Sequence, residues 1–418
     1  MKFSQISRIT RATALSMAIG LGMTACSTDY TLDYLYVTGS KSVAGSPNGT
    51  VSAYKVDNQS GSLQQMVDSP YDSGGINPVA VVLSPNSQAV YVLNHDSSNI
   101  VEFLIGTDGK LYPKNTYNLG PAGTAGTFPV AAVIDGTGKY LVVAFAYQHG
   151  YPIGGVGPGG VAVFAINSDN SLNSTPVANG ALPYFLAGSN PVSIGVSPCT
   201  TAPLACPANY VPYIYVVEQN PGTSGGSLIR QFQMNLTTGA LTPLATATVA
   251  AGVTPHAIAE DPTARFVYVT DSTSNQLIGY IVQSNGTLSP MNNGPFSTSL
   301  YPEGITVDPR GKYVYVTNYN ASTVSGYAID TATGTPAGVF SNGVSPTGTG
   351  PNCVTIEPSQ GVYLYTSNFV DNSVSGMQLD AHTGALANIQ NTPFNTAGNP
   401  TCAVAVQAGA HSFQALQP

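Results

Sequence analysis

A proline-led unit recurs seven times along this chain, at a period of about 50 residues, and this repeat restricts the possible folds more than any other feature. Its clearest copy begins at Pro302 with a short apolar segment and continues through residues 311–318, which read Gly-Lys-Tyr-Val-Tyr-Val-Thr-Asn. The prolines are Pro78, Pro129, Pro191, Pro255, Pro302, Pro351 and Pro400, and the aromatic segments start at Tyr34, Val90, Tyr140, Tyr213, Phe266, Tyr313 and Tyr363. Such periodicity predicts one structural unit that is copied and stacked.

Two further segments complete each unit. A third strand is expected at Thr50–Val56, Asn99–Ile105, Gly160–Ile166, Ser227–Met234, Gln276–Val282, Thr323–Ile329 and Ser373–Leu379. A fourth begins near a Gly-x-Leu step, as at Gly61, Gly239, Gly286 and Gly384. Val, Thr and Tyr favour strands, while the 45 Gly and 31 Pro residues favour turns. Four short strands per unit predict an all-β fold, a seven-bladed β-propeller with four-stranded blades.

The phase of the repeat predicts how the ring closes. The first unit starts at its second strand, near Asp33, and the inner strand that it lacks appears at the far end as Pro400–Val406. Pairing that strand with Tyr34–Thr38 would close the ring and remove two exposed sheet edges. The propeller is therefore expected over residues 33–418, with His411–Leu416 either a further strand or a tail.

These segments resemble the YVTN-repeat and lactonase-like seven-bladed β-propellers, a family that includes the cytoplasmic 6-phosphogluconolactonase type. Residues 315–318, which read Tyr-Val-Thr-Asn, carry the motif, and the resemblance extends over about residues 34–407. The resemblance implies the propeller fold. It leaves the activity open, because members of one fold family bind or hydrolyse different compounds.

The N-terminus has the pattern of a secretion signal. Lys2, Arg8 and Arg11 are followed by an apolar stretch that is too short for a permanent membrane helix. Residues 21–26, Leu-Gly-Met-Thr-Ala-Cys, resemble a bacterial lipobox, although Met23 stands where Leu is usual. We expect residues 1–25 to be a lipoprotein signal peptide, Cys26 to be acylated and residues 26–32 to form a tether. An ordinary cleaved signal is the alternative.

This interpretation places the protein in the bacterial cell envelope, facing the periplasm or the cell surface. The full chain has a net charge of −8, from 12 basic and 20 acidic residues. Loss of residues 1–25 removes three basic residues and no acidic ones, which leaves −11. This charge argues against nucleic acid as a partner, so the lipid on Cys26 would provide the membrane contact. We expect a monomer.

Four other cysteines occur in two pairs. Cys199 and Cys206 lie seven residues apart in a proline-rich insertion, where an exported protein is expected to form a disulfide. Cys353 and Cys402 both stand two residues after a repeat proline, where the other units have a small residue. For this second pair the sequence leaves two roles open: the cysteines either fill a tight site as small residues or form a disulfide between neighbouring inner strands.

Polar residues collect where the inner strands begin and the second strands end, at the face called here the top face. The residues that follow the seven prolines are Val79, Val130, Val192, His256, Glu303, Asn352 and Thr401. The second strands contribute His95, His149, Glu218, Asp271, Asn318 and Asn368 at or just beyond their ends. A channel mouth that is half polar and half apolar is a typical ligand site. Solvated strand ends with no function are the alternative.

Two functions follow from this candidate site. The first is binding of a small polar ligand, a glycan or a protein at the top face, with contacts from His95, His149, Glu218, Asp271, Asn318, Asn352 and Asn368. The second is hydrolysis of a lactone or related ester, with His256 as general base beside Glu303.

The ligand classes can be narrowed further. Few basic residues are expected near the top face, and no arginine, which argues against a phosphorylated sugar lactone. A zinc site from His95, His149 and His256 is geometrically possible, but their spacing does not require one. We therefore expect neither a metal nor a cofactor.

Overall fold

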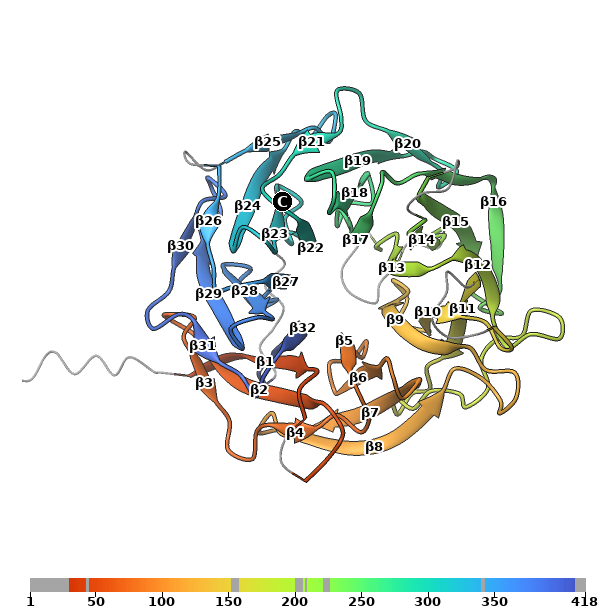
Figure 1. Ribbon diagram of the computed structural model, residues 1–418, viewed down its shortest axis with the longest axis horizontal. Coiled ribbons are helices and arrows are strands. Elements are labelled where there is room, and N and C mark those ends of the chain that lie inside the picture. Colours follow the sequence, from red (N-terminus) through yellow and green to blue (C-terminus); the bar gives the residue numbers. More distant parts are fainter. Residues whose placement is uncertain are drawn as a thin grey trace, which may run out of the picture.

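The computed structural model describes residues 30–42, 45–151, 158–199, 206, 209–220, 226–339 and 343–409. All regular elements in these ranges are β-strands, which form seven antiparallel sheets arranged as a ring around a central axis (Figure 1). The predicted all-β, seven-bladed propeller is therefore confirmed. The proposed signal peptide, Cys26 and the segment His411–Leu416 lie outside the described residues. The described ranges contain no helix with the length and apolar character needed to cross a bilayer.

Each blade has an inner, a second, a third and an outer strand. From the first blade to the seventh, the inner strands are β32 (Pro400–Gln407), β5 (Pro78–Leu83), β9 (Thr127–Ile134), β13 (Pro191–Val196), β17 (Pro255–Glu260), β22 (Pro302–Val307) and β27 (Pro351–Ile356). The second strands are β1 (Thr31–Gly39), β6 (Ala89–Asn94), β10 (Tyr140–Tyr147), β14 (Tyr213–Glu218), β18 (Phe266–Asp271), β23 (Tyr313–Asn318) and β28 (Tyr363–Asn368).

The third strands are β2 (Thr50–Asp57), β7 (Asn99–Ile105), β11 (Pro158–Ala165), β15 (Leu228–Met234), β19 (Gln276–Val282), β24 (Thr323–Ile329) and β29 (Ser373–Leu379). The outer strand is continuous in three blades, as β8 (Leu111–Asn118), β12 (Phe185–Ser189) and β16 (Leu241–Ala250). In the others it consists of two short pieces: β3 (Leu63–Gln65) and β4 (Tyr71–Asp72), β20 (Leu288–Pro290) and β21 (Phe296–Ser297), β25 (Pro336–Gly338) and β26 (Ser345–Pro346), and β30 (Leu386–Asn388) and β31 (Phe394–Asn395).

The ring closes as its sequence phase predicts. The strand β32 pairs antiparallel with β1, with Val404 opposite Tyr36 and Asp33 opposite Gln407. The strand β1 begins at Thr31, two residues before the expected start of the propeller. Closure covers the edge that β1 would otherwise expose and gives the first blade an inner strand like those of the other six.

Tyrosines of the second strands link each blade to the next one. In the third blade Tyr140 donates a hydrogen bond to the carbonyl of Leu236 in the fourth blade, at 3.4 Å. In the other six blades a tyrosine hydroxyl in this strand donates one to a carbonyl in a turn of the following blade. The pairs are Tyr36–Gly109, Tyr91–Asn170, Tyr215–Gly286, Tyr268–Gly334, Tyr315–Gly384 and Tyr365–Gly61, at 2.5–2.8 Å. These turn residues all have positive φ, from 66° to 81°, which favours Gly or Asn. The aromatic strand and the Gly-x-Leu step are thus two halves of one contact between blades.

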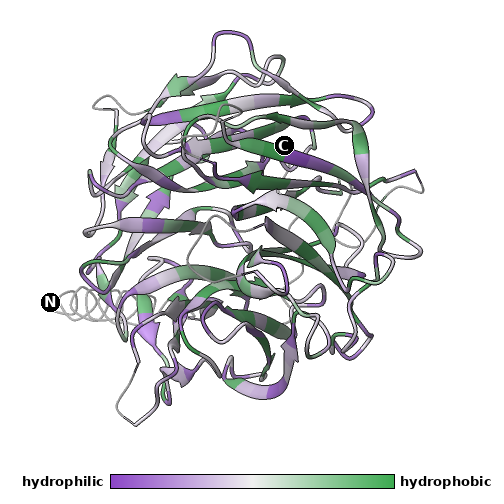
Figure 2. Cartoon of the chain, turned by 45° about the vertical axis from the view of Figure 1, so that its right-hand side comes forward, coloured by the Kyte–Doolittle hydropathy of each residue, from purple (hydrophilic) through white to green (hydrophobic). Residues whose placement is uncertain are grey.

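Apolar side chains fill the spaces between neighbouring blades. One cluster joins Tyr36 and Val51 of the first blade to Val90 and Phe103 of the second, and comparable clusters lie at the other interfaces. Figure 2 shows hydrophobic residues mainly along the strands and hydrophilic ones mainly in the connections. Since each sheet is covered on both faces, the core is divided among the blade interfaces.

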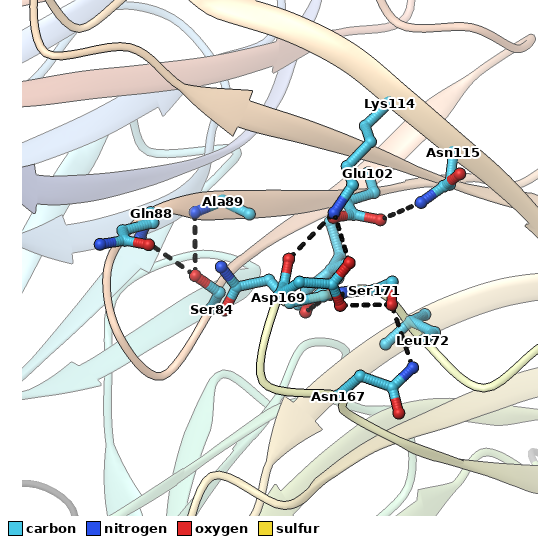
Figure 3. Close-up of polar contacts among 12 residues, drawn as sticks. Ser84, Gln88, Ala89, Glu102, Lys114, Asn115, Asn167, Asp169, Ser171 and Leu172 are labelled. Atoms are coloured by element: carbon cyan, nitrogen blue, oxygen red, sulfur yellow. Dashed lines mark hydrogen bonds and ion pairs between the residues drawn. The ribbon is translucent and has the colours of Figure 1, made fainter.

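One polar cluster also bridges two blades (Figure 3). The ammonium group of Lys114 lies 3.3 Å from the buried carboxylate of Glu102 and 3.1 Å from that of Asp169, in a turn of the next blade. Glu102 also accepts hydrogen bonds from Asn115 and Tyr117, at 2.9 and 2.8 Å. Because its charge is paired and hydrogen-bonded, this buried carboxylate is compatible with a stable interface.

Both cysteine pairs form disulfides. The bond between Cys199 and Cys206 confirms the prediction for the insertion. The bond between Cys353 and Cys402 decides the question that the sequence leaves open, because it joins the inner strands β27 and β32. It therefore connects the seventh blade to the strand that closes the ring.

Candidate functional site

The mouth of the central channel is built in the same way in each blade. The proline at the start of an inner strand pairs with a residue at or near the end of the second strand, as Pro255 does with Asp271 and Pro302 with Asn318. The pairing then shifts register immediately after the proline. The residue that follows the proline is therefore displaced from the regular ladder, at the point where the inner strand meets the top face.

The residues that follow the prolines are all half-buried. Val79, Val130 and Val192 pack against the apolar clusters between the second and fifth blades. His256 and Glu303 occupy the same place on the neighbouring inner strands β17 and β22. The structure thus retains the predicted division of the mouth into an apolar and a polar part.

The two ionisable side chains of the polar part have strongly shifted pKa values. Burial lowers the pKa of His256 to about 4, so its imidazole is neutral at pH 7. Burial raises the pKa of Glu303 to about 7, so its carboxyl group exchanges a proton near neutral pH. Within the described part of the chain, no hydrogen bond or ion pair joins these two side chains.

Polar groups at the mouth also hold adjacent blades together. The amide of Asn352 donates to the carbonyl of Pro400 at 3.2 Å, and the hydroxyl of Thr401 donates to that of Pro78 at 2.6 Å. The oxygen Oδ1 of Asn352 is buried and accepts no hydrogen bond from any described residue. Asn352 is thus a structural link that retains one free acceptor.

Glu218 lies in a structural rather than an open position. Its side chain is buried, and its Oε1 lies 2.5 Å from Nε of Arg230 on the third strand of the same blade. Burial raises the pKa of Glu218, and Arg230 partly opposes this shift. Arg230 is an arginine near the top face, contrary to expectation, but its guanidinium is held by this carboxylate.

The other strand-end residues form hydrogen bonds inside their own blades. Asp271 accepts hydrogen bonds from the backbone N–H groups of Val253 and Thr254, at 2.8 and 2.9 Å. Asn318 and Asn368 are fully buried and donate to hydroxyl groups at the start of the third strand. Ligand contact by Glu218, Asp271, Asn318 and Asn368 stays a prediction, and their geometry favours a role in holding the turns.

The two other histidines expected at the mouth, His95 and His149, lie on its apolar side. His95 lies 2.6 Å from Asp96, and its ring is 4.8 Å from that of Phe128. His149 is exposed in the turn after β10. The described residues contain no group of three or more His, Cys, Asp and Glu side chains that could hold a metal ion. His95, His149 and His256 are thus not brought together.

Two further features of the channel were not predicted from the sequence. Glu260 ends β17 at a position where five other inner strands have Leu, Ile or Val, and burial raises its pKa to about 8. Tyr301 lies 6.3 Å from Tyr319 at the mouth, and the negative charge of Glu303 contributes to a raised pKa of Tyr319. Alignment of the seven units by their prolines would reveal Glu260 and Tyr301, because each differs in type from most residues at the equivalent position.

The fold and the site define a class, the seven-bladed β-propellers with a partly polar channel mouth. Within this class, the family described as "Lactonase, 7-bladed beta-propeller" matches residues 226–356, a range that includes His256 and Glu303. This match is confined to residues 226–356, so it shows that this part of the chain is similar to the lactonase-type propellers. No curated protein matches the chain.

Solved structures support the same fold. A periplasmic gluconolactonase of Pseudomonas aeruginosa has a TM-score of 0.68 at 18% identity, over 91% of this chain and 100% of its own. A Bacteroides fragilis protein provisionally named a 6-phosphogluconolactonase has a TM-score of 0.67 at 19% identity, over 90% of this chain and 98% of its own. A Lactobacillus plantarum protein has a TM-score of 0.64 at 15% identity, over 90% and 100%. At these identities the likeness concerns the fold.

Proposed function

We propose that this protein hydrolyses a sugar lactone that carries no phosphate, at the polar part of the channel mouth. The observation that carries the proposal is the position of Glu303, whose carboxyl group lies at the mouth with a pKa of about 7. A general base is most effective when its pKa lies near the working pH. The match of the lactonase family over Glu303 and His256 supports the same reaction.

In the proposed reaction Glu303 is the general base and His256 is a hydrogen-bond donor, whereas the sequence predicts His256 as the base beside Glu303. The Glu303 carboxylate accepts a proton from water while the water oxygen bonds to the lactone carbonyl carbon. The bond from that carbon to the ring oxygen then breaks, and the ring oxygen takes the proton back from Glu303, which gives a hydroxy acid. Since His256 is neutral, it serves as an N–H donor to the carbonyl oxygen rather than as the base.

Two observations support a substrate without phosphate. Arg265 and Arg310 lie in turns at the opposite face, where they pair with Asp261 and Asp308. Arg230, which lies closer to the mouth, is bound to Glu218. A similar fold in a periplasmic gluconolactonase agrees with a simple sugar lactone.

Binding without turnover is the second candidate. It is favoured by the absence of any described hydrogen-bond partner that would orient His256 or Glu303 for catalysis, and by the free acceptor on Asn352. In this case the mouth would recognise a polar ligand and release it unchanged.

We also propose export and anchoring through a lipid on Cys26. The two disulfides support export, because structural disulfides persist in oxidising compartments. Release of a hydroxy acid would then take place in the cell envelope.

The deciding experiment follows acid release at pH 7.5 from glucono-δ-lactone, galactono-γ-lactone and 6-phosphoglucono-δ-lactone, each corrected for spontaneous hydrolysis. We expect turnover of an unphosphorylated lactone, and a loss of about 10²–10⁴-fold in rate for Glu303→Gln. His382→Ala, in an exposed turn at the opposite face, is the matched control for His256→Ala. Wild-type protein that binds these lactones without turnover supports the second candidate, and absence of both effects rejects the site.

A further inference from the structure

The residue before each inner-strand proline has an unusual backbone at the channel mouth. In six of the seven blades this residue has positive φ, between 43° and 69°. Four are Asn or Gly, which adopt this conformation readily: Asn77, Asn190, Gly350 and Asn399. The other two are aromatic, Phe128 with φ 60° and Tyr301 with φ 58°. For bulky residues this region is a costly outlier, and such strain is retained chiefly at functional sites.

Each of the two strained residues is paired with another aromatic ring. Phe128 lies 5.6 Å from Tyr147 in an edge-to-face arrangement and 4.8 Å from the ring of His95. Tyr301 lies 6.3 Å from Tyr319. All five rings are half-buried, so each pair presents part of its surface to solvent at the mouth. We call the two pairs, Phe128 with Tyr147 and Tyr301 with Tyr319, the aromatic platforms.

The platforms belong to the third and sixth blades. Their inner strands, β9 and β22, lie on opposite sides of the central axis (Figure 1). A carboxyl group accompanies each platform, because Asp96 is bonded to the His95 ring beside Phe128 and the charge of Glu303 acts on Tyr319. Each side of the mouth thus combines partly exposed aromatic rings with a carboxyl group that can accept hydrogen bonds from hydroxyl groups.

We propose that the two aromatic platforms bind sugar rings of one oligosaccharide that spans the channel mouth. A pyranose ring has an apolar face of C–H groups and an edge of hydroxyl groups, which is the complement of an aromatic ring flanked by carboxylates. The strongly negative chain disfavours nucleic acid bases as the stacked rings. The inference rests on the proposed function, since it extends that site from one sugar lactone to a longer glycan.

The test replaces each strained aromatic residue by Asn, which three other blades have at the equivalent position before the proline. Phe128→Asn and Tyr301→Asn each remove one platform and install the residue found at Asn77, Asn190 and Asn399. Because Asn tolerates positive φ, both variants should fold with an unchanged or higher melting temperature. The matched control is Tyr112→Asn, which removes an exposed ring from the outer strand β8, away from the mouth.

Binding of the full-length chain to malto-, cello- and chito-oligosaccharides of one to six rings is measured by calorimetry. We expect the wild type to bind at least one series, with affinity that rises with length, and each mouth variant to weaken binding by about tenfold. Tyr112→Asn should bind as the wild type does.

The proposal is wrong if the wild type binds none of these oligosaccharides, or if both mouth variants bind like the control. Binding of apolar peptides in place of sugars would identify the platforms as a protein site and also reject it. Loss of sugar binding in Phe128→Asn, with lactone turnover absent from the wild type, would retain the platforms and reject the hydrolase. Lactone turnover without oligosaccharide binding would retain the hydrolase and reject the platforms.

Discussion

The carboxyl group of Glu260 occupies the space that a side chain at Gly195 would require. The two residues lie on the neighbouring inner strands β17 and β13, and a Cβ atom on Gly195 would collide with Oε1 of Glu260. This oxygen is buried and has no hydrogen-bond partner among the described residues. The glycine therefore makes room for the one acidic residue in an otherwise aliphatic layer of the channel.

This contact predicts a coupling between the two positions. Gly195→Ala should destabilise the protein by about 1–3 kcal/mol, because the added methyl group meets the Glu260 carboxyl. The same change should cost much less in a Glu260→Ala background, since the obstacle is then absent. Urea unfolding of both single variants and the double variant measures the coupling. Additive effects would contradict the contact.

Glu260 also predicts how stability depends on pH. Its pKa rises from 4.5 in a model compound to about 8 in the fold, so the folded state favours the protonated form. That contribution is complete below the unfolded pKa and is lost as pH rises through about 8. Glu260→Gln stays neutral, so its melting temperature should equal that of the wild type at pH 5 and exceed it by a few degrees at pH 9. An equal difference at both pH values would show that Glu260 is ionised in the fold.

The raised pKa of Glu303 predicts the pH dependence of any lactone turnover. The carboxylate form is the base, so the rate should rise through a midpoint near pH 7 and level off above it. His256 is neutral throughout this range, because its pKa is about 4. Initial rates between pH 5 and 8, corrected for spontaneous hydrolysis, test this. A midpoint that persists in Glu303→Gln would assign the titration to another group.

The bond between Cys353 and Cys402 should stabilise the closed ring. It spans 49 residues of sequence, for which the chain-entropy treatment gives about 4 kcal/mol. Replacement of both cysteines by Ala, the residue at the equivalent Ala80, Ala131 and Ala257, should lower the melting temperature without disturbing the packing. Reduction of the wild type should lower the melting temperature by a similar amount. Because reduction breaks both disulfides, a variant that retains only the Cys353–Cys402 bond is reduced as well, to measure the effect of this bond alone. Equal melting temperatures would show that the bond adds nothing.

The lipid anchor is tested by Cys26→Ser. This change should prevent acylation, so the protein should move from the membrane fraction to the soluble fraction or remain as unprocessed precursor. Incorporation of radiolabelled palmitate and fractionation of cells measure the two effects. A processed Cys26→Ser protein that stays in the membrane fraction would refute the lipobox interpretation.

The candidate site was only partly predictable from the sequence. The position of His256 and Glu303 after equivalent prolines places them at the mouth, because the repeat fixes their place in the blade. Their roles were not predictable, since a pKa depends on how much protein surrounds the group, and segments remote in sequence provide that surrounding. Asn318 and Asn368 were expected to face a ligand, but they are buried, because a polar end of a strand can equally satisfy its own hairpin.

The sequence by itself determined the number of blades, the order of their strands and the closure by β32. These follow from the period of the repeat and from the need to cover both faces and the edges of every sheet, which are properties of any chain with this pattern. Only the tertiary structure decided that Cys353 bonds to Cys402, that Glu260 lies against Gly195 and that the strands β9 and β22 lie on opposite sides of the central axis. Those relationships join different blades, and their distances are set by how the blades pack around the axis rather than by spacing along the chain.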